Sequence, residues 1–392
     1  MWSRFRVGLS RYIINATVRL SIILGVLPYG YNARRKRIVA KNYCLIYSIL
    51  IDVVLIALIL YKCYREVRVY WDNIAEWSLM MALSQLVNLA HLYSHFAILW
   101  TNWKEYDSVL DMFNEFATME RSYFAKHNIL CDNCATFHNY LAWWTFVMLL
   151  NNIVFFYIIR DKFTRISIYM LISFFIIVIP VNVLLVAVLQ FYTVVLNIYR
   201  NIWTLQQRLI YLSSCGLQRV NVDNLMREIE EIVVVYMRLQ RLSERSNSIY
   251  GKQVFLYINA IVGDNTTKTF LLLLIWKGTD FSWNNVYVFY LIVISTVEFW
   301  LIIAACELTL NAAYDFSQLL RSFNECTHLD DKSQRELEVL ALFCASRKPR
   351  FRLCGLMDLD YSKGLSILLT IVLHIIYLVQ THYVVFYYDW DE

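Results

Sequence analysis

Seven apolar stretches, each of roughly 20 residues, dominate this sequence. A helix needs about 20 consecutive, mostly apolar residues to cross the ~30 Å hydrocarbon core of a bilayer. The predicted membrane-spanning segments are 43–61, 78–99, 137–159, 166–189, 254–275, 286–305 and 364–388. The sequence therefore predicts an all-α integral membrane protein with seven transmembrane helices.

The composition excludes the main alternative fold classes. Of the 392 residues, 59% are hydrophobic and 17% are charged, whereas an average soluble domain is about 45–50% apolar and about 25% charged. Intrinsic disorder needs low hydrophobicity, which this chain does not have. The chain contains only 9 glycines and 3 prolines, which argues against collagen-like and turn-rich all-β architectures.

Basic residues divide unevenly between the two sides of the predicted bundle. The N-terminal segment and the second, fourth and sixth loops hold 28 of the 36 Lys and Arg residues, while the other loops and the C-terminal tail hold 7. Loops rich in Lys and Arg stay in the cytoplasm, so we expect a cytoplasmic N-terminus and an extracellular C-terminus. This topology and anionic lipid explain the net charge of +5, and no nucleic-acid partner is expected.

The predicted orientation is opposite to that of a G-protein-coupled receptor, which also has seven spans. Glu120-Arg121-Ser122-Tyr123 faintly resembles the Asp-Arg-Tyr triplet of that class, but it precedes the third span instead of following it. We interpret it as a charge cluster on a solvated segment.

Long loops lie only on the predicted cytoplasmic side, where apolar residues at helical spacing predict that the helices extend below the membrane. These extensions could form an assembly platform or could pack within one subunit. The predicted divisions are a cytoplasmic segment 1–42, a six-helix bundle 43–305, a cytoplasmic anchor 306–363, the last helix 364–388 and an extracellular tail 389–392.

Two groups of residues contain histidines that could bind a metal, and the first also contains cysteines. The ligands His127, Cys131, Cys134 and His138 are too crowded for a typical zinc site. Ser84, Asn88, His91 and His95 share one face of the second span, which favours interhelical hydrogen bonds or a wet cavity. No catalytic motif stands out, so we expect no enzyme, no metal and no cofactor.

Intramembrane carboxylates are functional candidates by default, because charge in a bilayer is costly. Asp52 lies in the first predicted span and Glu298 in the sixth. Asp264 and Lys268 are four residues apart and could pair on one helix face. Lys268 is also a possible partner for Glu298. Pro180 is expected to kink the fourth span and free backbone carbonyls.

The last span carries one polar stripe. At about 100° per residue, six polar side chains fall within about 120° of arc. They are Ser366, Thr370, His374, Tyr377, Gln380 and Thr381. Such a stripe can line an aqueous pore formed by several copies, or it can pack against polar partners inside one bundle.

Two motifs in the last part of the chain resemble those of insect gustatory receptors. The run Cys354-Gly355-Leu356-Met357-Asp358-Leu359-Asp360 is similar to the segment that precedes the last helix in that family. The family signature in the last helix is Thr-Tyr, five hydrophobic residues and Gln. Here the spacing and Gln380 are kept, but Leu373 and His374 replace the Thr-Tyr pair, which indicates a divergent member.

The resemblance implies a tetrameric, ligand-gated cation channel related to insect odorant receptors. It implies that the last helix lines the pore, with Gln380 in its outer half, and that a small tastant binds in the outer half of the bundle. By depth, the candidate ligand-binding residues are Asn88, Asn151, Asn152, Phe155, Tyr157, Tyr287 and Tyr290. A homotetramer or a heterotetramer with other gustatory receptors is expected, surrounded by membrane lipid, in the plasma membrane of gustatory-neuron dendrites.

Two other functions remain open from the sequence. One is a metabotropic seven-helix receptor, which an outward N-terminus would support. The other is a membrane transporter in which Asp52, Glu298 and His91 carry ions.

Overall fold

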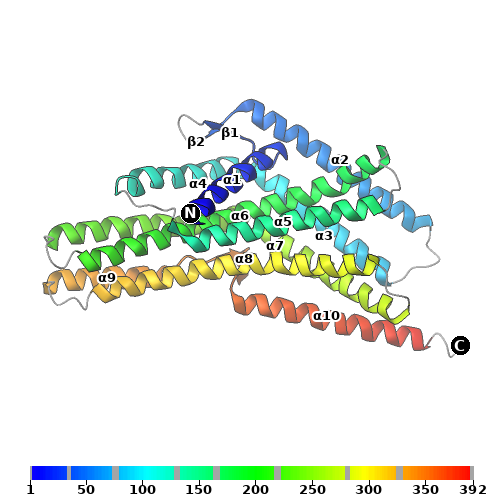
Figure 1. Ribbon diagram of the computed structural model, residues 1–392. Coiled ribbons are helices and arrows are strands. Elements are labelled where there is room, and N and C mark those ends of the chain that lie inside the picture. Colours follow the sequence, from blue (N-terminus) through cyan, green and yellow to red (C-terminus); the bar gives the residue numbers. More distant parts are fainter. Residues whose placement is uncertain are drawn as a thin grey trace.

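Long helices that run beyond the predicted membrane spans make up most of the molecule (Figure 1). The computed structural model describes residues 2–32, 37–72, 79–127, 133–161, 168–215, 222–278, 283–323 and 330–388. Its helices are α1 Trp2–Ile23, α2 Asn42–Asp72, α3 Leu79–Lys104, α4 Tyr106–Met119, a π-helical turn η2 Glu120–Phe124, α5 Ala135–Asp161, α6 Ile168–Cys215, α7 Val222–Gly278, α8 Trp283–Ser322, α9 Asp331–Ser346 and α10 Tyr361–Tyr388.

In the described part of the chain, four short strands form two antiparallel hairpins. They are β1 Tyr29–Asn32 with β2 Arg37–Ala40, and β3 Arg352–Leu353 with β4 Met357–Asp358. The first hairpin connects α1 to α2, and the second lies directly before α10. Within the described residues, the chain is helical wherever it was predicted to span the membrane.

Seven different helices contain the seven predicted spans, which confirms the all-α membrane fold. They are α2, α3, α5, α6, α7, α8 and α10. Within the described residues, α2, α5, α6, α8 and α10 are long and apolar enough to cross a bilayer. The other two, α3 and α7, pack against each other, and both also contact α6.

Three helices extend well past their predicted spans, as the helical spacing predicted. Helix α6 continues to Cys215, α7 begins at Val222, and α8 continues to Ser322. The polar run from Asp264 to Lys268 does not interrupt α7, whose 57 residues form one continuous helix. A helix can carry such a run without breaking, because all its backbone hydrogen bonds are internal.

The helix ends that adjoin the predicted outer loops gather at one end of the bundle (Figure 1). They are the C-terminal ends of α2, α5, α7 and α10. The C-terminal ends of α6 and α8 lie at the opposite end of the bundle, beside α9. This arrangement matches the predicted alternation of the chain across the membrane.

The most deeply buried core follows α6 and the parts of α7 and α8 that pack on it. Tyr192 stacks on Trp144 with ring centroids 4.6 Å apart, and Tyr236 stacks on Phe316 at 4.5 Å. Burying one large apolar side chain contributes roughly 1.5–3 kcal/mol. By contrast, α2, α3 and α10 expose many large apolar residues in a single copy of the chain.

Candidate functional site: the last helix, its hinge and a buried polar network

Helix α10 is attached to the bundle along one narrow stripe. Gly364, Ile371 and Leu378 are buried, and these positions recur every seven residues on one face. Through this stripe α10 contacts α7 and α8. Figure 1 shows α10 lying along one edge of the bundle. Most of its remaining surface is therefore open in a single copy of the chain.

The predicted polar stripe lies on the open part of α10. Ser366, Thr370, His374, Tyr377 and Gln380 are exposed, and Thr381 is half-buried. Four of these six residues bond the carbonyl four residues earlier in α10 itself. The closest of these contacts joins His374 Nδ1 to Thr370 O at 2.7 Å.

The tight hairpin of β3 and β4, residues 352–358, leads into α10 and is called the hinge below. Cys354 and Gly355 occupy the turn with φ angles of 51° and 72°, a left-handed conformation that glycine tolerates and cysteine rarely adopts. The Arg352 Nε donates to Asp358 Oδ1 at 2.8 Å across the hairpin. The hairpin thus has a fixed shape, and its sequence is the first motif that resembles gustatory receptors.

The hinge is pressed against α7. A Cβ on Gly251 would meet the Arg352 carbonyl oxygen at 3.3 Å, so the glycine permits close approach. The Asn247 side chain donates to the Arg350 carbonyl. Phe351 and Leu353 are almost fully buried and anchor the hairpin in the core. No sequence motif indicated the part that Gly251 plays.

The first turn of α10 is held by its own cap and by α8. The Asp360 Oδ1 accepts from the Lys363 amide at 2.7 Å, which satisfies a donor that the helix start leaves free. Tyr361 stacks on Trp300 with centroids 5.5 Å apart. A Cβ on Gly364 would lie 2.6 Å from the Ile303 Cδ1, so only glycine fits here without a shift.

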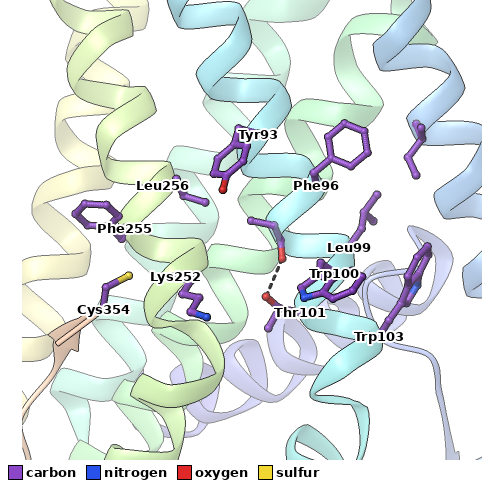
Figure 2. A pocket seen from close by; sticks show the side chains of 12 residues that line it. Tyr93, Phe96, Leu99, Trp100, Thr101, Trp103, Lys252, Phe255, Leu256 and Cys354 are labelled. Carbon is purple, nitrogen blue, oxygen red and sulfur yellow. Dashed lines mark hydrogen bonds between the residues drawn. The ribbon is translucent and has the colours of Figure 1, made fainter. Parts of the chain in front are cut away.

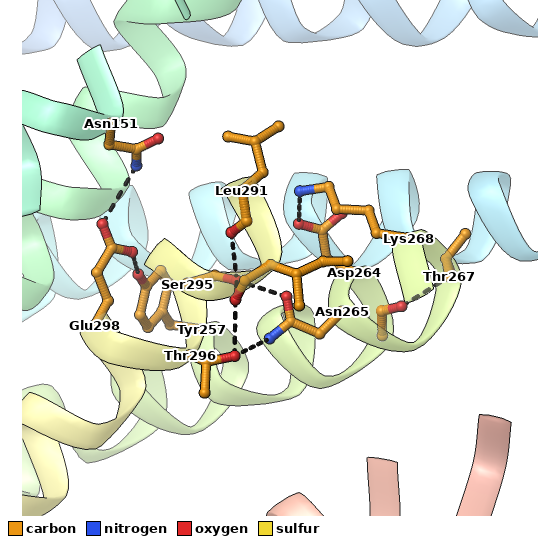
Figure 3. A network of polar contacts seen from close by, with 12 residues as sticks. Asn151, Tyr257, Asp264, Asn265, Thr267, Lys268, Leu291, Ser295, Thr296 and Glu298 are labelled. Atoms are coloured by element: carbon orange, nitrogen blue, oxygen red, sulfur yellow. Dashed lines mark hydrogen bonds and ion pairs between the residues drawn. The ribbon is translucent and has the colours of Figure 1, made fainter. Parts of the chain in front are cut away.

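Glu298 lies at the centre of a buried polar contact between three helices (Figure 3). It is 3% exposed. Its Oε2 accepts from the Tyr257 hydroxyl at 2.9 Å, and its Oε1 accepts from Asn151 Nδ2 at 3.3 Å. A buried carboxyl needs such donors, since an unpaired one is costly. The contact joins α5, α7 and α8.

A second set of polar contacts joins α7 and α8 farther along the same interface (Figure 3). The Ser295 Oγ donates to Asn265 Oδ1 at 2.5 Å, and Asn265 Nδ2 donates to Thr296 Oγ1 at 3.4 Å. On α7, Lys268 Nζ lies 2.5 Å from Asp264 Oδ2, which confirms the predicted pair. Lys268 thus forms an ion pair with Asp264, while Glu298 accepts hydrogen bonds from Tyr257 and Asn151.

The residues predicted to bind a ligand are divided among several environments. Asn151 contacts Glu298, whereas Asn152 and Asn182 exchange side-chain hydrogen bonds of 3.1 and 2.7 Å between α5 and α6. Asn88, Phe155, Tyr287 and Tyr290 are half-buried, and Tyr157 is half-exposed. The structure places Asn151 and Asn152 at helix interfaces but does not gather all seven into one cavity.

The polar face predicted on α3 makes an interhelical contact. His95 Nε2 lies 2.9 Å from the carbonyl oxygen of Pro180, the proline predicted to kink the fourth span. Asp52 Oδ2 accepts from Trp103 Nε1 at 2.8 Å, which links α2 to α3. These contacts agree with the hydrogen-bonding interpretation of the intramembrane polar residues.

The group predicted around His127 and His138 is spread apart. His127 faces Glu228 and Glu231 at 4.0 and 3.5 Å, while His138 Nδ1 bonds Ser10 Oγ at 2.7 Å. Cys131 lies outside the described residues. Within the described part of the chain, no group of three or more His, Cys, Asp or Glu residues could hold a metal ion.

Solved structures share this fold. The structure of insect olfactory receptor OR5 from Machilis hrabei, in complex with eugenol, matches with a TM-score of 0.67, covering 95% of this chain and 99% of that chain. The sequence identity is 12%. At that identity the likeness concerns the fold alone, which is the seven-helix fold predicted from the apolar stretches.

Sequence relatives and a family model cover almost the whole chain. The gustatory receptor for bitter taste 22e of Drosophila melanogaster is 24% identical over 383 residues, covering 93% of each chain. Another Drosophila relative, gustatory receptor 22a by name, is 24% identical over 387 residues, covering 96% of this chain and 95% of its own. The family model for the 7tm chemosensory receptor matches residues 14–385. The chain is therefore a member of the 7tm chemosensory receptor family and a multi-pass membrane protein.

Proposed function

We propose that this chain is a gustatory receptor that acts as a ligand-gated, non-selective cation channel. Four copies assemble around a shared axis, as a homotetramer or with other gustatory receptors, and α10 of each copy lines the pore. The observation that carries the proposal is the open polar stripe of α10. Its six predicted pore-lining residues bring hydroxyl, imidazole and amide groups to a surface that a single copy leaves largely uncovered.

Polar groups that face lipid carry a cost in free energy. Hydroxyl, imidazole and amide groups that face hydrocarbon are unfavourable, so they normally face protein or water. Ser366, Thr370 and His374 lie on the same open face. A central aqueous pore formed by several copies removes this cost and at the same time provides a path for ions.

The proposed orientation follows from the basic residues, with the N-terminus in the cytoplasm and the C-terminus outside. In this orientation the hinge before α10 lies at the cytoplasmic end of the pore and Gln380 lies in its outer half. Sixteen residues separate Gly364 from Gln380, which is about 24 Å at about 1.5 Å per residue. The proposed location is the plasma membrane of gustatory-neuron dendrites.

The proposed ligand is a small tastant that binds in the six-helix part of the chain. Among the predicted binding residues, Asn151 and Asn152 take part in interhelical hydrogen bonds. A ligand that competes for these donors would change how α5 packs on α6 and α8. Opening then requires that the ligand binds the open arrangement better than the closed one. The name of relative 22e makes bitter compounds the first class to test.

The test is electrical recording of the full-length chain in a membrane, with Gln380→Ala and His374→Ala compared with the unaltered protein. Both residues are on the proposed pore face, so we expect altered single-channel conductance or ion selectivity with intact surface expression. The matched control is Val379→Ala, because Val379 is exposed but points about 100° away from Gln380 on the same helix.

Three outcomes would count against the proposal. Unchanged currents in both pore-face variants would show that α10 does not line the pore. Ligand-driven substrate uptake without current would favour a transporter. Detection of an N-terminal tag on the outside of the cell would overturn the proposed orientation and favour a metabotropic receptor.

A further inference from the structure

An apolar groove runs along the outside of the bundle between α3 and α7 (Figure 2). Its wider part has a volume of about 690 Å³. Figure 2 shows Phe96 and Trp100 of α3, Phe255 and Leu256 of α7, and Cys354 of the hinge around it. This groove lies apart from the polar stripe of α10 and from the Glu298 contact.

A second hollow lengthens the groove in one direction. It has a volume of about 460 Å³ and shares Tyr93, Phe96 and Leu256 with the first. Together they extend from Trp103 to Leu89 on α3, fourteen residues or about 21 Å at about 1.5 Å per residue. One leaflet accounts for about 15 Å of the ~30 Å hydrocarbon core. The groove is therefore long enough to hold one acyl chain of one leaflet and to reach the headgroup layer.

Large aromatic side chains stand exposed along this groove. Tyr93 and Trp100 are each 66% exposed, and Trp103 is 41% exposed. Contiguous exposed apolar surface marks a binding site for protein or lipid. Tryptophan is also enriched where a membrane helix meets the headgroup layer. The aromatic residues thus suit contact with lipid and place the Trp103 end of the groove near that layer.

The two ends of the groove differ in charge. Lys252, an exposed residue of α7, lines the end that also holds Trp103 and Cys354. The opposite end is lined by Leu89, Ala90 and other mainly apolar residues. No Asp or Glu is among the described residues that line either part. A molecule with one negative end and one long apolar part complements this pattern.

We propose that the groove binds an acidic phospholipid. Its acyl chain lies between α3 and α7, and its negatively charged headgroup contacts the Lys252 ammonium. The Lys252 end lies at the level of the hinge before α10, since Cys354 lines it too. The assignment to the cytoplasmic leaflet rests on the orientation in the proposed function, whereas the binding itself does not depend on channel activity.

The test uses the full-length chain reconstituted in phosphatidylcholine bilayers. Photoactivatable phosphatidylserine and phosphatidylcholine carry the same reactive group in the same acyl chain, and mass spectrometry maps their adducts on the protein. We expect adducts on α3 between Leu89 and Thr101 and on α7 near Leu256. We expect phosphatidylserine to label these segments at least threefold more than phosphatidylcholine.

Variants separate charge recognition from simple apolar contact. Lys252→Gln should reduce the labelling by phosphatidylserine to the level of phosphatidylcholine, while Lys252→Arg should retain the preference because it keeps the charge. Lys332→Gln is the matched control, since Lys332 is a highly exposed lysine on α9. Lys332→Gln should leave the labelling by both phosphatidylserine and phosphatidylcholine unchanged.

Several results would overturn the proposal. Equal labelling by both probes in the unaltered protein would indicate an apolar contact without headgroup recognition. Adducts elsewhere but none in the groove would exclude a lipid occupant. Crosslinks between α3 helices of two copies would assign the groove to a subunit interface. Because labelling needs no current, a failed channel experiment leaves this result valid.

Discussion

The sequence marked Glu298 as a functional candidate but did not show which residues contact it. Its place in an apolar span marked it as a functional candidate, because carboxyl groups in membranes are costly. Its partners could not be predicted, since Tyr257 and Asn151 are 41 and 147 residues away in sequence. The Asp264–Lys268 pair could be predicted, because a separation of four residues fixes two side chains on one helix face.

Removing the Tyr257 hydroxyl tests the contact around Glu298. Tyr257→Phe takes away one of the two donors, Tyr257 and Asn151, that bond the buried Glu298. Loss of one partner from a buried polar contact costs about 1–3 kcal/mol. We expect a lower melting temperature for the protein in lipid nanodiscs, measured by thermal aggregation.

The matched control for that change is Tyr287→Phe, because Tyr287 is a half-buried tyrosine of α8 outside this contact. It should shift the melting temperature little. Equal shifts in the two variants would show that the Tyr257 hydrogen bond has no special weight.

At the scale of elements, the apolar stretches predicted every spanning helix because burial in lipid requires that length of apolar chain. The spacing also predicted the extensions of α6, α7 and α8. It did not show that the segment 317–345 divides into the end of α8 and a separate α9. Nor did it show the groove between α3 and α7, because a groove depends on which helices become neighbours. Sequence spacing describes one helix at a time.

The close approach of α10 to α8 can be tested at the hinge. Gly364→Ala places a Cβ 2.6 Å from the Ile303 Cδ1, which is too close for real atoms. Overpacking of this kind costs about 1–3 kcal/mol. We expect faster hydrogen–deuterium exchange in the first turns of α10.

Ile303→Val removes the atom that collides and leaves a smaller branched side chain. The double variant Gly364→Ala with Ile303→Val should therefore recover much of the exchange protection that Gly364→Ala loses. If the effects of the two changes on exchange protection simply add, the clash with Ile303 does not cause the lost protection.

At the scale of the whole molecule, two of the surfaces that a single chain leaves uncovered bear on assembly. One is the open face of α10. The other lies on α9, in the segment 306–363 predicted to be an anchor, where Val339 and Leu342 are 65% and 64% exposed. The sequence predicted both segments, but which faces stay open in one copy became visible only once the helices were packed.

The predicted anchor segment 306–363 includes α9, so we expect α9 to hold the copies together. Leu342→Asp puts a charge on its exposed apolar face, and we expect the detergent-solubilised protein to shift from a tetramer to smaller species in mass photometry. Lys332→Glu changes charge at an exposed polar position of the same helix and should leave the tetramer intact. A tetramer that survives Leu342→Asp would place the assembly contacts elsewhere.

The central claim is that α10 lines an ion pore, and chemical modification at Gln380 tests it most directly. Gln380→Cys introduces a thiol on the proposed pore face, and a positively charged methanethiosulfonate reagent is applied from outside during a tastant-evoked current. Val379→Cys serves as the control on the other side of the helix. We expect an irreversible loss of at least half of the current in Gln380→Cys and little change in Val379→Cys. An unchanged current in Gln380→Cys, with labelling of the thiol confirmed by mass spectrometry, would contradict it.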